Sequence, residues 1–324
     1  MAVLSALAVA VAAGLDLATG EPPDRVHPVA WFGRAVAPVD RSWPHPRAAG
    51  VLAAAVMPLA AAALVAGLVG AVAAWRPPAG VGLAGVVLFV ATSLRRLLAV
   101  AREVTAATRR DLPRAREGLR ALAGRDANAL SAGEVRSAVV ESLAENLADG
   151  LVAPLGAFAL GAALGARLPA ATLPGGVAGV TLAGSTATAL ALGSAGAVWT
   201  KAVNTMDSML GYRSKPVGWG AARLDDAVMW LPARAAALLL AAVCLASGSL
   251  VRAREWVDGV PSPNSGWPMG VLAAALGVSL VKPGAYELPG GSDLPSVADA
   301  DSARRRVAAA GGLAYLLAGV VAWG

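Results

Sequence analysis

Residues 51–75 read VLAAAVMPLAAAALVAGLVGAVAAW and contain no Asp, Glu, Lys or Arg. A bilayer core about 30 Å thick is crossed by about 20 residues of α-helix, because each residue advances about 1.5 Å. The stretch is long enough for that crossing. It therefore predicts a transmembrane helix and decides the class of protein to which the chain belongs.

Further stretches without acidic or basic residues extend this prediction along the chain. They are 79–94, 151–166, 170–199, 235–251 and 307–323. Those of about sixteen residues are marginal as spans, and 170–199, rich in Gly and Thr, is expected to be shielded by neighbouring helices. Residues 269–281 could form a tilted span, a re-entrant segment or a buried helix. We expect 1–15 to be a retained first helix, because no basic residue precedes its apolar part as in a signal peptide.

The composition agrees with a membrane protein. Of the 324 residues, 57% are hydrophobic and 15% charged, with a mean hydropathy of +0.62. Soluble domains carry about 25% charged residues. We therefore predict an all-α fold, a polytopic integral membrane helical bundle with large cytoplasmic loops, as one membrane-embedded domain over 1–324 without an independent soluble domain.

The basic residues are concentrated between the apolar stretches. Ten arginines lie in 95–150, and the segments 19–48 and 200–234 hold further Lys and Arg. The positive-inside rule predicts that these three loops are cytoplasmic in a multi-pass cell-membrane protein. Although the net charge is +6, the same loops carry Asp and Glu, so we expect no nucleic-acid partner. The single cysteine, Cys244, and the two histidines argue against a disulfide or a structural zinc site.

Two glycine patterns are interpreted as helix packing. Gly80, Gly82 and Gly85 match the literal spacing of a dinucleotide-binding loop, but no alternating strand and helix pattern surrounds them. Gly161 and Gly165 form a small-xxx-small pair. Neither pattern is expected to bind a nucleotide.

An acidic row recurs every fourth residue at Glu141, Glu145 and Asp149, beside an apolar stripe of Val, Leu and Leu. This periodicity predicts an amphipathic helix over 134–150 that enters the membrane at Leu151. Like charges at this spacing repel, so the row needs solvent or a counter-ion. It is either a solvated face or a face that binds magnesium or an amine.

A second polar cluster follows the apolar stretch 170–199. It reads KAVNTMDSMLGYR over 201–213, and Arg223, Asp225, Asp226 and Arg234 come soon after it. Adjacent aspartates between arginines could hold a metal phosphate, or they could be an ordinary ionic loop with helix caps. Two shorter motifs, His27-Pro28-Val29 and Ser262-Pro263-Asn264-Ser265-Gly266, are turns by composition.

Taken in order, these motifs resemble the CobD/CbiB family of adenosylcobinamide-phosphate synthases, membrane proteins of cobalamin biosynthesis. The matching elements are Asp16 with His27-Pro28-Val29 and Gly33, ESLAEN at 141–146 with Asp149-Gly150, NTMDSM at 204–209 with Gly211-Tyr212, ARLDD at 222–226 with Pro232-Ala233-Arg234, and SPNSG at 262–266 with Tyr286. Five motifs in the family order on a membrane scaffold make the resemblance specific. It covers nearly the whole chain but is weak beyond Tyr286.

The resemblance implies a carbon-nitrogen ligase. A propionate of adenosylcobyric acid would be joined as an amide to aminopropanol phosphate, or to aminopropanol, with ATP and Mg²⁺ required. The partners implied are these substrates, the lipid bilayer and other enzymes of the corrinoid pathway. Because a carboxylate is a poor electrophile, it must first be activated, and Mg²⁺ would neutralise the phosphates.

The resemblance also suggests roles for individual residues. Glu141 or Glu145 would deprotonate the attacking ammonium, and His27 would carry a proton or contact the corrin. Asp207, Asp225 and Asp226 would hold Mg²⁺. The residues that would bind nucleotide or substrate are Asn146, Lys201, Asn204, Ser208, Arg223, Arg234 and Asn264.

Two other classes of function use the same scaffold. A membrane transporter would usually place ionisable groups at membrane depth, and the apolar stretches carry none, although the Gly-rich 170–199 could be an interrupted helix. A non-catalytic scaffold for corrinoid enzymes is the third class. A product assay separates the three.

Overall fold

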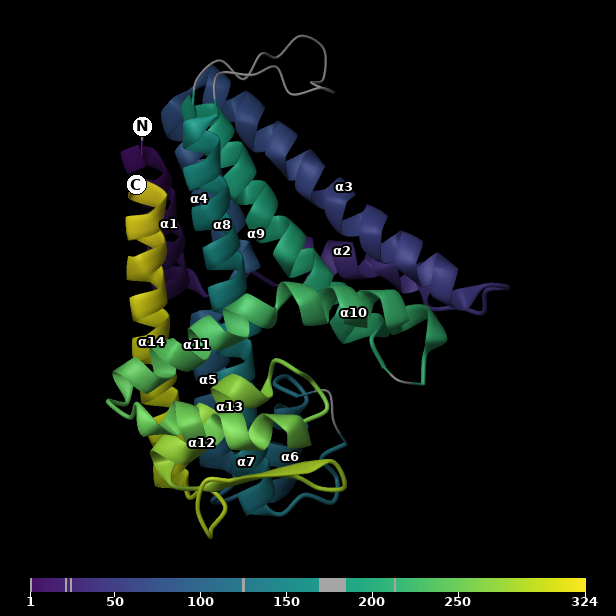
Figure 1. Cartoon of the computed structure of the whole chain (residues 1–324), viewed down its shortest axis with the longest axis vertical. Helices are drawn as coiled ribbons and strands as arrows, with labels where there is room; N and C mark the ends of the chain where they lie inside the picture. The colour runs from purple at the N-terminus through teal and green to yellow at the C-terminus, as the bar shows by residue number, and fades with distance from the viewer. Residues whose placement is uncertain (1, 21, 24, 124–125, 169–184, 213) are drawn as a thin grey trace. The chain divides into compact units, whose positions relative to one another are not determined.

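The computed structural model describes the chain except residues 1, 21, 24, 124–125, 169–184 and 213. Helices account for most of the described residues, with one short hairpin as the strands among them (Figure 1), which confirms the all-α prediction. The first half contains α1 Ala2–Thr19, α2 Pro28–Val36, η1 Ala37–Val39, α3 Pro46–Trp75, α4 Pro77–Ala91, α5 Leu94–Ala107, α6 Leu112–Leu119, α7 Ala132–Leu147, the π-helical η2 Ala148–Val152 and α8 Ala153–Arg167. The second half contains α9 Ser185–Leu210, η4 Pro216–Gly218, α10 Trp219–Val228, α11 Trp230–Val243, α12 Gly248–Trp256, η5 Val257–Gly259, α13 Gly266–Leu276, an antiparallel hairpin of β1 Ser279–Lys282 and β2 Tyr286–Pro289, and α14 Val297–Trp323.

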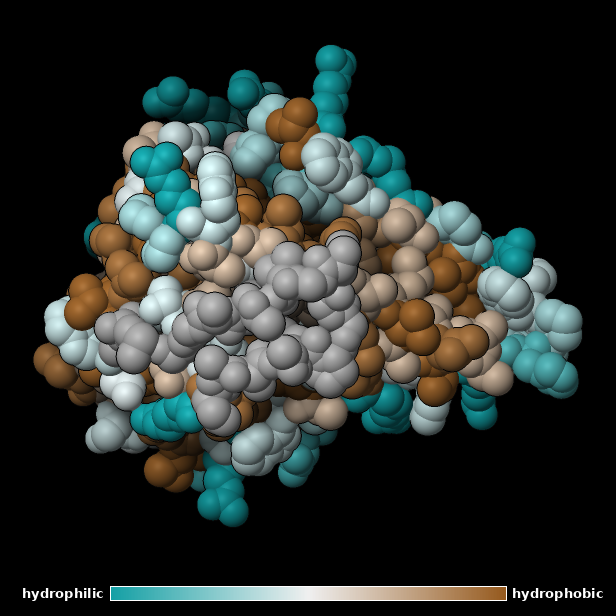
Figure 2. Space-filling view, turned by 90° about the horizontal axis from the view of Figure 1, so that it is seen from above, coloured by the Kyte–Doolittle hydropathy of each residue, from teal (hydrophilic) through white to brown (hydrophobic). Residues whose placement is uncertain are grey.

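Several of these helices are long and apolar enough to cross a membrane. Within the described residues there are four, or five if a bent pair is one span: Pro46–Trp75, Pro77–Ala107, Ala132–Arg167, Val297–Trp323, and the pair Pro216–Val228 with Trp230–Val243. On α3 the large apolar side chains are turned outward, with Leu52 65% and Leu64 75% exposed. Apolar side chains are likewise visible on the molecular surface in Figure 2. Such exposure is expected where lipid covers a helix, so the chain is a multi-pass membrane protein.

Three predicted segments differ in detail from the structure. The stretch 235–251 is not one helix: α11 ends in a Schellman motif, in which Ala246 N–H donates to the Ala241 carbonyl and Leu245 has a left-handed φ of 51°. The predicted loop 95–150 is mostly helical, since α5, α6 and α7 fill it. Of 170–199, the part up to residue 184 lies outside the described residues, and the rest belongs to α9.

Residues 269–281 settle one of the open alternatives. Their helical part belongs to α13, whose residues from Pro268 to Ala274 are all buried, and the chain then turns into β1. The segment is therefore a buried helix followed by a strand.

Contacts group the chain into two compact units. The first comprises residues 1–93, 153–228 and 314–324, and the second comprises 94–152 and 229–313. In the first unit α9 packs on α8 and α3, and α1 packs on α4 (Figure 1). In the second unit α7 packs on α5, α13 and β1, and α12 packs on α13. The single domain over 1–324 stays a prediction.

The predicted glycine packing is confirmed within the first unit except at Gly82, where an added Cβ would meet nothing within 4 Å. A Cβ at Gly161 would lie 2.5 Å from the Leu192 carbonyl oxygen, and one at Gly85 would lie 2.5 Å from Val11 Cγ1. Both distances are shorter than a Cβ makes to a non-bonded heavy atom. The absence of a side chain at these glycines therefore lets α8 approach α9 and α4 approach α1.

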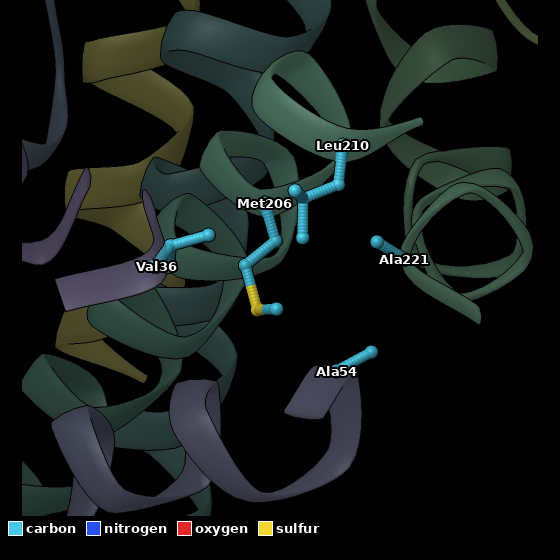
Figure 3. Close-up of a cluster of buried hydrophobic side chains, with 5 residues drawn as sticks. All are labelled: Val36, Ala54, Met206, Leu210 and Ala221. Carbon is cyan, nitrogen blue, oxygen red and sulfur yellow. The ribbon is translucent and has the colours of Figure 1, made fainter. Parts of the chain in front are cut away.

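A small hydrophobic cluster fixes the polar end of α9. Its members come from four helices and point toward one another (Figure 3): Val36, Ala54, Met206, Leu210 and Ala221. Each is at most 3% exposed. The cluster holds α2, α3 and α10 against the last turns of α9, where the sequence predicted polar site residues.

The close approach of α3 to η4 gives a testable consequence. A Cβ at Gly50 would overlap the Val217 carbonyl, whereas a Cβ at Gly67, on the same helix, would meet nothing within 4 Å. We expect Gly50→Ala to lower the free energy of unfolding by about 1–3 kcal/mol, because backbone must move to relieve the overlap. Gly67→Ala, the matched control, is expected to be neutral or slightly stabilising because Ala favours helix. Thermal unfolding in detergent measures both, and equal midpoints for the two variants would contradict the expectation.

Candidate functional site

The polar residues predicted in 201–226 lie on two packed helices of the first unit. Met206 and Leu210 turn one face of α9 into the hydrophobic cluster, and α10 packs on α9 and α3. Asn204 and Asp207 project from α9 beside that buried face and are half-buried. The 3.6-residue period of the helix therefore separates the anchoring side chains from the functional candidates.

Two interactions order the carboxylates of α10. The Asn204 amide donates to Asp225 Oδ1 at 3.4 Å, which links α9 to α10. The exposed Arg223 guanidinium pairs with Asp226 Oδ2 at 3.3 Å. The sequence-predicted Asn204, Arg223, Asp225 and Asp226 are thus brought together.

Asp207 has an unusual electrostatic environment. It lies on α9, beyond the apolar stretch that ends at Trp199 and outside the candidate spans. Burial, reinforced by the negative charge of Asp226, raises the pKa of Asp207 to about 6. Gly211 permits this arrangement, because a Cβ there would overlap the Asp207 carboxylate. A carboxylate that is costly to ionise gains more than an ordinary one from a bound cation.

The donor set fits a magnesium phosphate rather than a metal held by protein alone. In the described residues no three His, Cys, Asp or Glu side chains form a ready-made metal-binding group. Mg²⁺ needs no such group, since it usually binds one or two carboxylates together with substrate phosphates and water. Asp207 and Asp226, whose charges interact, meet that requirement. The assignment of Asp207, Asp225 and Asp226 to a metal stays a prediction.

The raised pKa of Asp207 predicts a pH dependence of stability. The carboxyl has an ordinary pKa of 3.8 and a folded-state pKa of about 6. Between these values the folded chain binds more protons than the unfolded chain, so the free energy of unfolding should fall as pH rises and level off above about 6. We expect a decrease on the order of 1–2 kcal/mol, and Asp207→Asn should remove it.

Thermal unfolding from about pH 4.5 to about pH 7.5 measures this slope. Asp258→Asn, at an exposed position in η5, is the matched control and should keep it. An unchanged slope in Asp207→Asn would exclude Asp207 as its source.

Three other predicted residues occupy the same unit. Lys201 is half-buried on α9, and Ser208 is exposed, with its hydroxyl donating to the Asn204 carbonyl at 2.9 Å. His27 begins α2: its Nδ1 accepts from the Val29 N–H at 3.2 Å, with Pro28 in the first turn. His27 therefore has a structural role as a helix cap, and its proposed role in proton transfer stays a prediction.

In the second unit, Glu141 is the centre of a buried network. Its side chain has 0% exposure, although it lies in the row that could have been a solvated face. Ser137 Oγ and Tyr286 Oη each donate to it at 2.9 Å, and Ser137 Oγ in turn accepts from the Val281 N–H at 2.7 Å. The solvated-face alternative is thus wrong at Glu141, because the β-hairpin packs on that side of α7.

The rest of the acidic row is more accessible. Glu145 and Asn146 are half-buried on α7, and the Asn146 amide donates to the Ser142 carbonyl at 2.9 Å. Asp149 lies in η2, where α-helical hydrogen bonding gives way to a π-helical turn. π-Helical turns are rare in proteins, and those that occur are often found at functional sites. Glu145 lies one helical turn before this one and is only half-buried, so it stays the candidate of the acidic row for chemistry.

Arg234 and Asn264 form a second polar group in this unit. The Arg234 guanidinium donates to Asn264 Oδ1 at 3.0 Å and lies 4.3 Å from the ring centroid of Trp230 and 5.3 Å from that of Trp267. Asn264 is 4% exposed. Stacking and hydrogen bonding together hold the guanidinium in one orientation, as recognition of a planar or phosphate anion requires.

Some members of these groups were not among the predicted site residues. Ser137 precedes Glu141 by one helical turn, so its position on the same face could have been inferred. Tyr286 belongs to a matching motif, but its bond to Glu141 spans 145 residues of sequence. Trp230 precedes Arg234 by one helical turn, so its contact could have been inferred in the same way, whereas the contact of Trp267 left no local signal.

Comparison with known proteins agrees with these motifs. The family described as CobD/Cbib protein matches residues 9–311. A protein named probable cobalamin biosynthesis protein CobD, from Methanothrix thermoacetophila, is 32% identical over 321 residues, which cover 95% of this chain and 93% of that protein. Cobalamin biosynthesis protein CobD from Rhodobacter capsulatus is 35% identical over 291 residues, covering 85% and 82%. No solved structure matches the chain. With the match extending through both groups of polar residues, the chain belongs to the CobD/CbiB family.

Proposed function

We propose that this protein, a cobalamin biosynthesis protein by family, is an ATP-dependent amide ligase. It joins a propionate of adenosylcobyric acid to (R)-1-aminopropan-2-ol phosphate, or to aminopropanol, and yields adenosylcobinamide phosphate or adenosylcobinamide. The observation that carries the proposal is the α9–α10 pair, where Asp207 interacts with Asp226 and Asn204 bonds to Asp225. Two carboxylates that repel each other would bind Mg²⁺, and the neighbouring Arg223 would bind the phosphate that accompanies it.

The reaction needs an activated carboxyl group, which bound Mg²⁺ and ATP would supply. Asp207, Asp225 and Asp226 would hold the cation, and Arg223 and Lys201 would bind phosphate oxygens. Ser208, exposed beside them, would add a hydroxyl contact. Cationic side chains and Mg²⁺ around the phosphates would stabilise the negative charge that develops on the phosphate oxygens as the carboxyl group is activated.

The amide bond itself forms when the amine nitrogen attacks the activated carbonyl carbon and the bond to the leaving oxygen breaks. The ammonium must first lose a proton, and Glu145 is the better base, because Glu141 is fully buried and bonded to Ser137 and Tyr286. Arg234, oriented by two indole rings, would bind the phosphate of the amine substrate. In the second unit, Asn146 and Asn264 would orient carboxamides of the corrin rim, and in the first unit Asn204 would contact nucleotide or substrate.

A product assay tests the proposal. The purified protein in detergent is incubated with adenosylcobyric acid, aminopropanol phosphate, ATP and Mg²⁺, and the amide is sought by mass. Parallel incubations with aminopropanol identify the amine. No product from either amine would refute the ligase, and flux of corrinoid across vesicles would then favour a transporter.

The site is proposed to lie at the cytoplasmic face of the cell membrane. Its Arg-rich segments support this orientation through the positive-inside rule. Reporter fusions at Ser131 and Gly259 test it: we expect the fusion at Ser131, which begins α7, to report a cytoplasmic location. A signal from the opposite side of the membrane at Ser131 would reverse the topology.

A further inference from the structure

An arginine-lined cleft in the second unit belongs to neither group of site residues. It has a volume of about 810 Å³ and is bounded by α5, α6 and the first turns of α14. Pockets of about 300–1,000 Å³ are typical of small-molecule sites. Five guanidinium side chains line it, those of Arg96, Arg102, Arg109, Arg110 and Arg114.

The cleft follows from the way α5 and α6 pack. Val100 and Val104 line it from the buried side of α5, and Gly118 allows α6 to approach, since a Cβ there would lie 3.0 Å from Val104 Cγ2. The turn after α5 reverses the chain between the two helices and carries Arg109 and Arg110. The arginines of both helices and of the turn therefore line one hollow.

The cleft carries an excess of available positive charge. In the described part of the chain, none of its five guanidinium groups forms an ion pair or a hydrogen bond with protein. Of its four carboxylates, Asp301 pairs with Arg304 at 3.5 Å, outside the cleft. Asp111 Oδ1 accepts from the backbone N–H of Arg114 at 3.0 Å and keeps its negative charge. Three carboxylates, of Glu103, Asp111 and Glu117, therefore face five guanidinium groups.

The five guanidinium groups are exposed and of like charge, so an anion bound between them relieves their mutual repulsion. Arginine forks bind phosphate oxygens bidentately, so five forks spread over two helices and a turn match the oxygens of more than one phosphate group. We propose that this cleft is a binding site for an anion with two or more phosphate groups. A soluble polyphosphate, such as that of a nucleotide, and the headgroups of anionic lipids offer the same chemistry, because Arg clusters beside spans attract lipid phosphates.

The inference does not rest on the proposed ligase, because its test measures binding without turnover. Inorganic tripolyphosphate is titrated into the full chain in neutral detergent, without Mg²⁺ or corrinoid. The triple variant Arg102→Gln, Arg109→Gln, Arg110→Gln is compared with the matched variant Arg47→Gln, Arg120→Gln, Arg254→Gln, which removes the same charge at exposed positions outside the cleft. We expect at least about tenfold weaker binding in the cleft variant alone.

A second arm distinguishes the source of the phosphates. Both variants and the wild type are placed in nanodiscs of phosphatidylcholine with or without phosphatidylglycerol, and their unfolding midpoints are measured. The site is a lipid site if two results are obtained together. Tripolyphosphate binds the cleft variant and its control equally, and phosphatidylglycerol raises the unfolding midpoint of the wild type and the control but not that of the cleft variant. If neither probe separates the cleft variant from its control, the proposal is wrong. Arg110→Gln alone repeats the test with the smallest disturbance to the fold.

Discussion

Conversion of Asp225 to asparagine is expected to abolish amide formation while the protein still inserts and folds. Asparagine keeps the shape of the side chain and can still accept from the Asn204 amide, whose present distance to Asp225 Oδ1 is 3.4 Å. It removes the negative charge that a magnesium phosphate needs. We expect product formation to fall by at least about a hundredfold, as when a metal-dependent step loses a charged ligand. Single-turnover assays with mass detection measure it.

The matched control for this variant is Asp258→Asn, the same chemical change at an exposed residue of η5. It should keep wild-type turnover. Thermal unfolding and membrane fractionation show whether Asp225→Asn is folded and inserted. Turnover at the wild-type rate in a folded Asp225→Asn protein would remove Asp225 from the site, and with it the assignment of the α9–α10 carboxylates.

Glu141 is expected to have the largest effect on stability among the acidic residues. Glu141→Ala would leave the hydroxyls of the buried Ser137 and the partly buried Tyr286 without the carboxylate to which each donates at 2.9 Å. Hydrogen bonds to a charged group contribute about 1.5–3 kcal/mol each, so we expect the free energy of unfolding to fall by about 3–5 kcal/mol. The loss should be visible as a large drop in the thermal midpoint.

Two single variants separate this network from catalysis. Tyr286→Phe and Ser137→Ala each remove one donor and should cost less than Glu141→Ala, and their combination should be non-additive because they share one acceptor. Glu255→Gln, at an exposed position of α12, is the control and should unfold like the wild type. If Glu141→Ala were as stable as Glu255→Gln but inactive, Glu141 would be a catalytic residue after all.

The contrast between Glu141 and Glu145 shows what helical periodicity cannot decide. Both belong to one helical row with equal spacing, so periodicity cannot assign them different roles. The hairpin of β1 and β2 packs on α7, and Glu141 is buried against it while Glu145 remains half-buried. One carboxylate thereby becomes a buried structural group, while the other keeps partial exposure.

The sequence by itself determined the membrane class, most of the helices and the family. Long uncharged runs such as 51–75 indicate the membrane class and most of the helices, because the cost of placing charge in lipid depends on local composition. Five motifs in the family order indicate the family. It did not find the break at Leu245, where the helix end depends on a left-handed residue that composition disfavours.

Only the tertiary structure decided which polar residues meet. Asp207 has a raised pKa because packing buries it and α10 places the charge of Asp226 near it. Glu141 is buried in a network to which Tyr286 returns from 145 residues away. From the sequence, the arginines of 95–150 indicated only membrane topology. In the structure, five of them line a cleft because α5 and α6 fold back on one another. Sequence spacing fixes the face of a helix on which a side chain lies. The exposure of that side chain to solvent, the charges near it and its hydrogen-bond partners depend on elements distant in sequence, which only tertiary packing brings close.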